Sequence, residues 1–152
     1  MSDTDWNYRV IWASTKGDVE KLREALENGA DCDAQDYLGT TAIIWAAYNG
    51  HADCVKILIE ANADINGKDS LGRTASFWAA SEGHKDCLRH LVAAHADITI
   101  ADSGGNTALS SALKQEHADC AALLRHALDI SGIKSDQHQN LRRYIKSNKP
   151  AP

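Results

Sequence analysis

The sequence lacks the features of a membrane or secreted protein. No apolar run approaches the ~18 residues that a membrane-spanning helix needs. The opening stretch, MSDTDWNYRV, is acidic and polar, so we expect no secretory signal, and no Asn-x-Ser/Thr sequon occurs. The four cysteines form no Cys-x-x-Cys pair, which favours reduced thiols in a cytoplasmic or nuclear protein. We therefore expect no partner in a membrane.

The sequence also lacks the short motifs that mark common enzymes. It contains no Gly-x-Ser-x-Gly, no His-Glu-x-x-His, no phosphate-binding loop and no Gly-x-Gly-x-x-Gly. Asp31, Asp64 and Asp97 recur with a turn, which indicates a structural role rather than acid–base work. We therefore expect no enzymatic activity and no cofactor.

Basic residues are scarce in most of the chain. Residues 1–130 carry 11 basic and 20 acidic side chains, whereas residues 131–152 carry five and one. An acidic body repels a phosphate backbone, so we expect no nucleic-acid partner. It attracts a protein with a basic patch, mainly by raising the association rate.

What the sequence does contain is a repeat with a period of 33 residues. A fixed period in this range is typical of a stack of similar supersecondary units, which works through a face rather than a catalytic cleft. The residues that recur at this spacing include Thr41, Thr74 and Thr107, then His51, His84 and His117, and the cysteines Cys54, Cys87 and Cys120.

Each unit reads as a turn followed by two short helices. Asp-x-x-Gly predicts the turn, with positive φ at its glycine, and the next Thr is a candidate helix N-cap. Gly-His then precedes a second helix, whose buried residues in one unit we expect to be Val55, Leu58 and Ile59. Neither helix reaches the ~12–15 residues of a marginally stable isolated helix, so each must pack on its neighbours.

These units resemble the ankyrin repeat. The resemblance rests on the period and on the recurring Gly-x-Thr-Ala, Trp-Ala-Ala, Gly-His and Ala-Asp-Ile blocks. The family pattern Thr-Pro-Leu-His-x-Ala-Ala is matched in part at residues 41–47 and 74–80, with Ala in place of the family Pro in both and with Ile44 and Phe77 in place of the family His. The resemblance implies an all-α ankyrin-repeat solenoid of helix–turn–helix units with β-hairpin-like turns.

We divide the chain into an ankyrin repeat domain and a tail. The domain is residues 1–130, with repeats at about 3–35, 36–68, 69–101 and 102–130, and the tail is residues 131–152. The outer units depart from the pattern, as capping repeats do; Glu116, for example, replaces a glycine. In the tail, Leu141, Tyr144 and Ile145 have helical spacing. They predict either a short capping helix or a frayed basic tail.

The sequence His-Ala-Asp-Cys occurs at residues 51–54 and 117–120, and its spacing of His and Cys suggests a metal site. The repeat favours a structural role, because the His belongs to the Gly-His block and the Cys stands where ankyrin units usually have Ile. Equivalent atoms in stacked units lie about 8–10 Å apart, too far for a disulfide or a shared zinc ion. We expect no metal, and we expect all four thiols, including Cys32, to be buried.

Trp12, Trp45 and Trp78 occupy one register in three consecutive units. By the resemblance, this register lies on the first helix and borders the concave groove. Two interpretations remain open. The indoles form an aromatic strip that contacts a partner, or each Trp replaces a packed Leu.

Further contact candidates are residues that differ between units, in particular exposed apolar side chains at turn tips. The predicted partner-binding residues are Trp12, Trp45, Trp78, Tyr37, Leu38, Tyr48, Asn49, Leu71, Arg73, Glu82 and Lys114. Asn66 looks like the ankyrin asparagine that an asparaginyl hydroxylase modifies, so it is a predicted hydroxylation site.

The expected function is therefore non-catalytic binding or scaffolding of another protein, by a monomer, through the concave helix face and the turn tips. One alternative is a reader of methylated lysine, since two neighbouring Trp can enclose a quaternary ammonium. Trp45 and Trp78 resemble that site in ankyrin domains of histone lysine methyltransferases, with Glu82 as a nearby carboxylate. A second alternative is a regulatory or inhibitory subunit that also engages its partner through Arg142 and Arg143.

Overall fold

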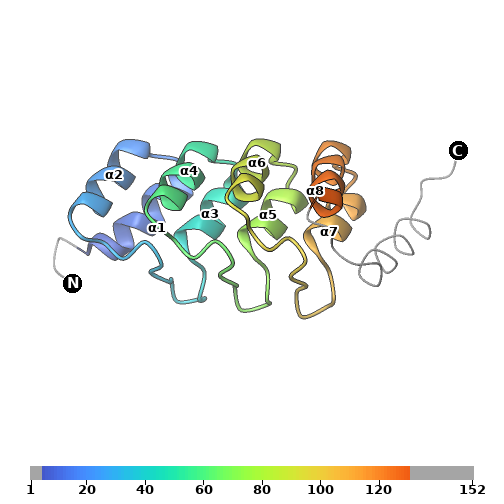
Figure 1. The fold of residues 1–152 in the computed structure, drawn as a ribbon. Helices are drawn as coiled ribbons and strands as arrows, with labels where there is room; N and C mark the ends of the chain where they lie inside the picture. The colour runs from blue at the N-terminus through green and yellow to red at the C-terminus, as the bar shows by residue number, and fades with distance from the viewer. Residues whose placement is uncertain (1–4, 131–152) are drawn as a thin grey trace, which may run out of the picture.

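The computed structural model describes residues 5–130, which form four antiparallel pairs of helices (Figure 1). First helices pack on first helices and second helices on second helices, so the stack has two layers. Within residues 5–130 this confirms the all-α solenoid. The helices are α1 (Trp6–Lys16), α2 (Val19–Glu27), α3 (Ala42–Asn49), α4 (Ala52–Glu60), α5 (Ala75–Ser81), α6 (Lys85–Ala93), α7 (Ala108–Lys114) and α8 (Ala118–Ile130).

Long turns join one pair to the next and project to the same side of the stack (Figure 1). In the first turn, Asp36 Oδ1 accepts the backbone N–H groups of Leu38 and Thr40, each at 2.9 Å. Gly39 has a φ of 77°, as the Asp-x-x-Gly pattern predicts. A single antiparallel bridge pairs Gln35 with Thr41, so the turn is hairpin-like.

A threonine precedes the first helix in each of the last three pairs, as predicted. The Thr74 hydroxyl accepts the Phe77 N–H, and the Thr107 hydroxyl accepts the Ser110 N–H, both at 3.2 Å. Thr41 departs from this pattern, since its buried hydroxyl has no hydrogen-bond partner. The N-cap prediction is therefore right in position for all three but right in hydrogen bonding for two.

The Gly-His block joins each pair of helices to the next. The imidazole Nε2 of His84 hydrogen-bonds the Tyr48 carbonyl oxygen at 3.0 Å, across 36 residues. A Cβ at Gly50 would lie 2.7 Å from the His84 ring, which is closer than real Cβ atoms come. The glycine is therefore needed twice at this position, for its φ of 78° and for the space that the imidazole fills.

The core lies between the two layers and takes buried side chains from both first and second helices. Val55 and Leu58 are fully buried, as predicted, while Ile59 is half-buried. The equivalent cysteines Cys54, Cys87 and Cys120 are buried and free. Cys32 differs, because it lies half-buried in the turn after α2, so the prediction that it is buried was wrong.

No helix within residues 5–130 is long and apolar enough to cross a membrane. The predicted helix around Leu141, Tyr144 and Ile145 lies outside the described residues.

Candidate functional site

Four aromatic side chains of α3 and α5 form one cluster. The Tyr48 ring lies edge-on to both Trp45 and Trp78, with centroid distances of 5.9 and 5.0 Å. Phe77 is edge-on to Trp78 at 5.6 Å. We call Trp45, Tyr48, Phe77 and Trp78 the aromatic cluster. It joins the second and third units of the stack and includes one exposed ring, that of Tyr48.

Two of the indoles are fixed by aspartates of the adjoining turns. The Trp45 Nε1–H donates to Asp36 Oδ2 at 2.9 Å, and the Trp78 Nε1–H donates to Asp69 Oδ2 at 3.0 Å. Each aspartate uses its other oxygen to hold the turn. Turn and helix are thereby locked together, and a half-buried indole keeps its polar atom satisfied.

Arg73 packs against the aromatic rings of the third unit and pairs with Asp69. Its guanidinium lies 4.5 Å from the Trp78 ring centroid and 5.9 Å from that of Phe77. Its Nε lies 3.7 Å from Asp69 Oδ2, an ion pair in which the Nε has no hydrogen-bond partner. Charge and ring contact therefore hold this side chain, which is 22% exposed.

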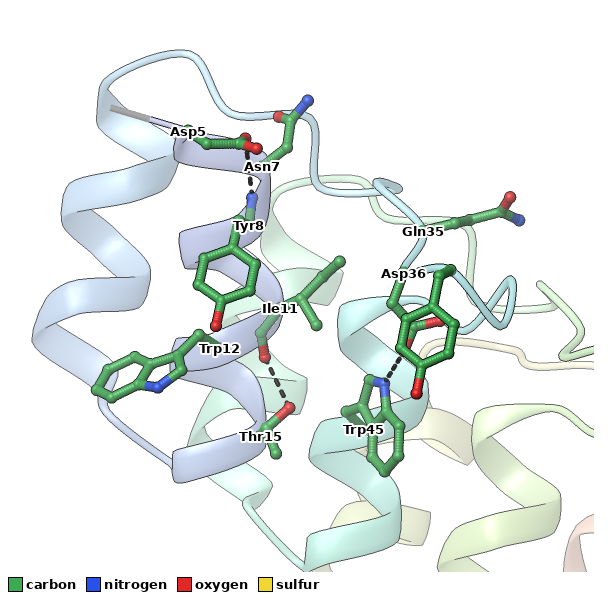
Figure 2. Close-up of a pocket in the computed structure, with 10 residues that line it drawn as sticks. Asp5, Asn7, Tyr8, Ile11, Trp12, Thr15, Gln35, Asp36 and Trp45 are labelled. Atoms are coloured by element: carbon green, nitrogen blue, oxygen red, sulfur yellow. Dashed lines mark hydrogen bonds between the residues drawn. The ribbon is translucent and has the colours of Figure 1, made fainter. Parts of the chain in front are cut away.

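A groove of about 420 Å³ lies between α1 and the turn that precedes α3 (Figure 2). We call it the N-terminal groove. Tyr8 and Thr15 of α1 line one side, and Asp36, Tyr37 and Trp45 line the other. It is continuous with the aromatic cluster, because Trp45 belongs to both.

Trp12 does not extend the aromatic cluster in the way its register predicts. Its indole is directed away from Trp45 (Figure 2). The ammonium group of Lys21 lies 4.9 Å from the Trp12 ring centroid. The interpretation of three stacked indoles is therefore replaced by two indoles bridged by Tyr48, with Trp12 turned toward α2.

The other predicted contact residues lie at turn tips and helix ends. Tyr37 is 95% exposed, Leu38 50% and Leu71 51%. Exposed polar side chains stand at the carboxyl ends of the first helices, namely Asn49, Glu82 and Lys114. These placements are compatible with contact, which stays a prediction for every one of them.

Sequence reasoning missed three residues of this surface. The Asp-x-x-Gly pattern predicts a role in the turns alone for Asp36 and Asp69, although each stands nine residues before a Trp and accepts its indole N–H. That equal spacing in two units was the available signal. Tyr8 was missed because it lies in a unit that departs from the repeat pattern; it is 61% exposed in the N-terminal groove.

Asn66 is exposed, and its side chain links two units. Its Oδ1 accepts the Asp97 N–H at 2.8 Å, as Asp33 Oδ1 accepts the Asp64 N–H at 2.7 Å one unit earlier. The asparagine thus has a structural role at the position where hydroxylation is predicted. Whether it is hydroxylated stays a prediction.

Asp31, Cys32 and Asp33 are the only metal-compatible cluster among residues 5–130, with ligand atoms within 4.8 Å of one another. Asp31 Oδ1 accepts the Asp33 N–H, and Cys32 Sγ lies 3.5 Å from the Ala61 carbonyl oxygen. Turn hydrogen bonds account for this grouping, so it does not point to a metal.

The four thiols should differ sharply in reactivity. Burial raises the pKa of Cys54 to about 11 and that of Cys87 to about 12, and nearby aspartates add to both. Burial also raises the pKa of Cys32, but this thiol is accessible. At pH 8 we expect iodoacetamide to label Cys32 at least about tenfold faster than the buried thiols.

Mass spectrometry of the labelled peptides reads this directly, and the urea-unfolded chain, which should label evenly, is the control. Raising the pH should speed labelling, since the reactive thiolate forms only as the pH approaches the raised pKa. Equal rates for Cys32 and Cys54 in the folded protein would contradict the burial described above.

Comparison with known proteins agrees with the repeat. A family model described as ankyrin repeats (3 copies) matches residues 10–102 and again residues 66–136, which together make up more than half of the chain. A search of curated proteins found no match.

Proposed function

The chain belongs to the ankyrin-repeat family, and we propose that it binds a partner protein, without catalysis, through the aromatic cluster, the N-terminal groove and the turn tips. Ankyrin repeats are generally protein–protein interaction modules and are typically non-catalytic. The observation that carries the proposal is the near-complete exposure of Tyr37 beside Trp45 and the groove. Exposed aromatic side chains next to a groove are typical of interface anchors.

Charge and size support the same function. The acidic body, residues 1–130, favours a partner with a basic patch, whose approach it accelerates. Four stacked units at about 10 Å each offer a surface long enough for the ~800 Å² that each partner buries in a standard interface. We propose a monomer in a reducing compartment, cytoplasm or nucleus, since the buried cysteines are all free.

The methyl-lysine alternative receives less support from the geometry. The Tyr48 ring lies edge-on to both Trp45 and Trp78, and Arg73 already covers Trp78 with a cation. The space in which those two indoles would enclose an ammonium group is therefore filled by the chain itself. The second alternative, a regulatory or inhibitory subunit, would use the same binding surface.

A binding experiment with matched variants tests the proposal. A protein captured from lysate on the full-length chain should bind Trp45→Ala/Trp78→Ala at least about tenfold more weakly, because anchors of this type dominate interface energy. Tyr48→Ala removes an exposed ring of the same surface and should also weaken binding. Lys56→Ala, at an exposed position of α4 in the other helix layer, should change the Kd less than about twofold.

Circular dichroism must show that each variant is folded. If folded variants of the aromatic cluster bind the captured protein as tightly as the parent chain, the cluster is packing alone. The proposal in this form would then fail.

A further inference from the structure

The two Trp–Asp pairs differ in what covers the indole. At Trp78 the chain supplies both an aromatic edge, from Tyr48 at 5.0 Å, and a guanidinium, from Arg73 at 4.5 Å. The same guanidinium pairs with Asp69 Oδ2, the oxygen that accepts the Trp78 indole N–H. In the third unit, therefore, an arginine lies over the indole ring and pairs with the carboxylate that accepts the indole N–H.

At Trp45, Tyr48 of the same helix supplies an aromatic edge at 5.9 Å, but the preceding unit supplies none. The residue 33 positions before Tyr48 is Thr15, which lines the N-terminal groove. Its hydroxyl donates to the Ile11 carbonyl oxygen at 2.8 Å and so stays on its own helix (Figure 2). The groove exists at this boundary because a short side chain stands where the next boundary has a tyrosine.

The position equivalent to Arg73 also carries a small side chain in the second unit. The residue 33 positions before Arg73 is Thr40, which is buried and too short to lie over Trp45. The carboxylate is nevertheless the same, since Asp36 Oδ2 accepts the Trp45 indole N–H at 2.9 Å as Asp69 does for Trp78. Trp45 and Asp36 are therefore arranged like Trp78 and Asp69, but Thr40 stands at the position equivalent to Arg73.

The lining of the N-terminal groove favours a positive occupant. Its charged side chains are Asp5 and Asp36, and none of its ten described lining residues is a lysine or arginine. Tyr8 and Tyr37 add exposed aromatic surface. A guanidinium suits this combination better than an ammonium, because its flat face stacks on a ring while its edge reaches a carboxylate.

We propose that the N-terminal groove receives an arginine side chain of the partner protein, with the guanidinium over Trp45 and paired with Asp36. This rests on the proposed function and names the chemistry that the partner must present there. It also gives the two pairs different roles: the site at Trp78 is closed by Arg73, and the site at Trp45 is open to a partner.

The first test uses the full-length ¹⁵N-labelled protein and N-acetyl-arginine methylamide as the probe. The Trp45 indole N–H resonance should shift saturably, with a Kd on the order of 1–10 mM for so small a ligand. The Trp78 indole resonance should shift at least about fivefold less, since Arg73 covers it. The corresponding lysine, trimethyl-lysine and tyrosine amides should each bind at least about fivefold more weakly than the arginine amide.

Two reciprocal variants make the test specific. Thr40→Arg gives Trp45 the internal cation that Trp78 has, so it should abolish the Trp45 response. Arg73→Thr is the reciprocal change: it uncovers Trp78, whose indole N–H should then respond to the probe, while the Trp45 response should persist because Arg73 does not line the N-terminal groove. If Thr40→Arg does not fold, Thr15→Tyr fills the groove from the other side and should have the same effect.

The failures are distinguishable. If a captured partner depends on Trp45 but the arginine amide causes no shift, or the tyrosine or trimethyl-lysine amide binds more tightly, the arginine proposal is overturned and the binding function stands. If the arginine amide binds as described but no protein partner depends on the surface, the proposed function fails instead. An unchanged Trp45 response in folded Thr40→Arg and Thr15→Tyr would place the probe elsewhere and also overturn the inference.

Discussion

Gly50→Ala should lower the free energy of unfolding by about 3–5 kcal/mol. Two costs combine: a Cβ at a φ of 78° is strained by about 1–2 kcal/mol, and the same Cβ lies 2.7 Å from the His84 ring. The imidazole must shift, which strains the packing and breaks its hydrogen bond to the Tyr48 carbonyl oxygen. Urea unfolding followed by circular dichroism measures the change.

Gly39→Ala is the matched control. Gly39 has nearly the same φ, 77°, but nothing lies within 4 Å of an added Cβ. Its substitution should cost only the backbone strain, about 1–2 kcal/mol. The difference between the two variants isolates the contact between neighbouring units. Equal losses of stability would show that the Gly-His contact contributes nothing beyond the backbone conformation of the glycine.

The repeat made the backbone predictable. A spacing of 33 residues transfers a conformational requirement from one unit to the next, so glycine at residue 29 indicates a left-handed residue at the equivalent positions. Asn62 and His95 stand there and have φ values of 63° and 64°. Glu116, which replaces a glycine of the Gly-His block, likewise has a φ of 62°. In these places the fold dictates the dihedral angle, and the side chain that must tolerate it varies.

The side-chain arrangement was less predictable, for a physical reason. A register of three tryptophans shows which helix face they share, but not the rotamer or hydrogen bond that each adopts. Trp45 turns to Asp36, whereas Trp12 turns toward Lys21. The open groove depends on a difference between units, Thr15 against Tyr48, and a search for what the units share passes over such differences.

Two leucines of one unit should separate the stability of the stack from its binding surface. Leu58 is fully buried in α4, and Leu58→Ala should cost about 3–5 kcal/mol through lost burial and the cavity left behind. Leu38 is 50% exposed at a turn tip, and Leu38→Ala should cost less than about 0.5 kcal/mol.

The effects of these two substitutions on partner binding should be the reverse of their effects on stability. At a temperature where both variants are folded, Leu38→Ala should weaken binding of the captured partner by about fivefold or more. The reason is that the substitution removes an apolar contact beside Tyr37 and the N-terminal groove. Leu58→Ala should leave the Kd within about twofold, since its side chain has no exposed surface to offer. Calorimetric unfolding and titration of the same samples give both quantities. Unchanged affinity in Leu38→Ala would show that this turn tip is not part of the binding surface. A loss of affinity in folded Leu58→Ala would show that binding depends on the rigidity of the stack as much as on its exposed residues.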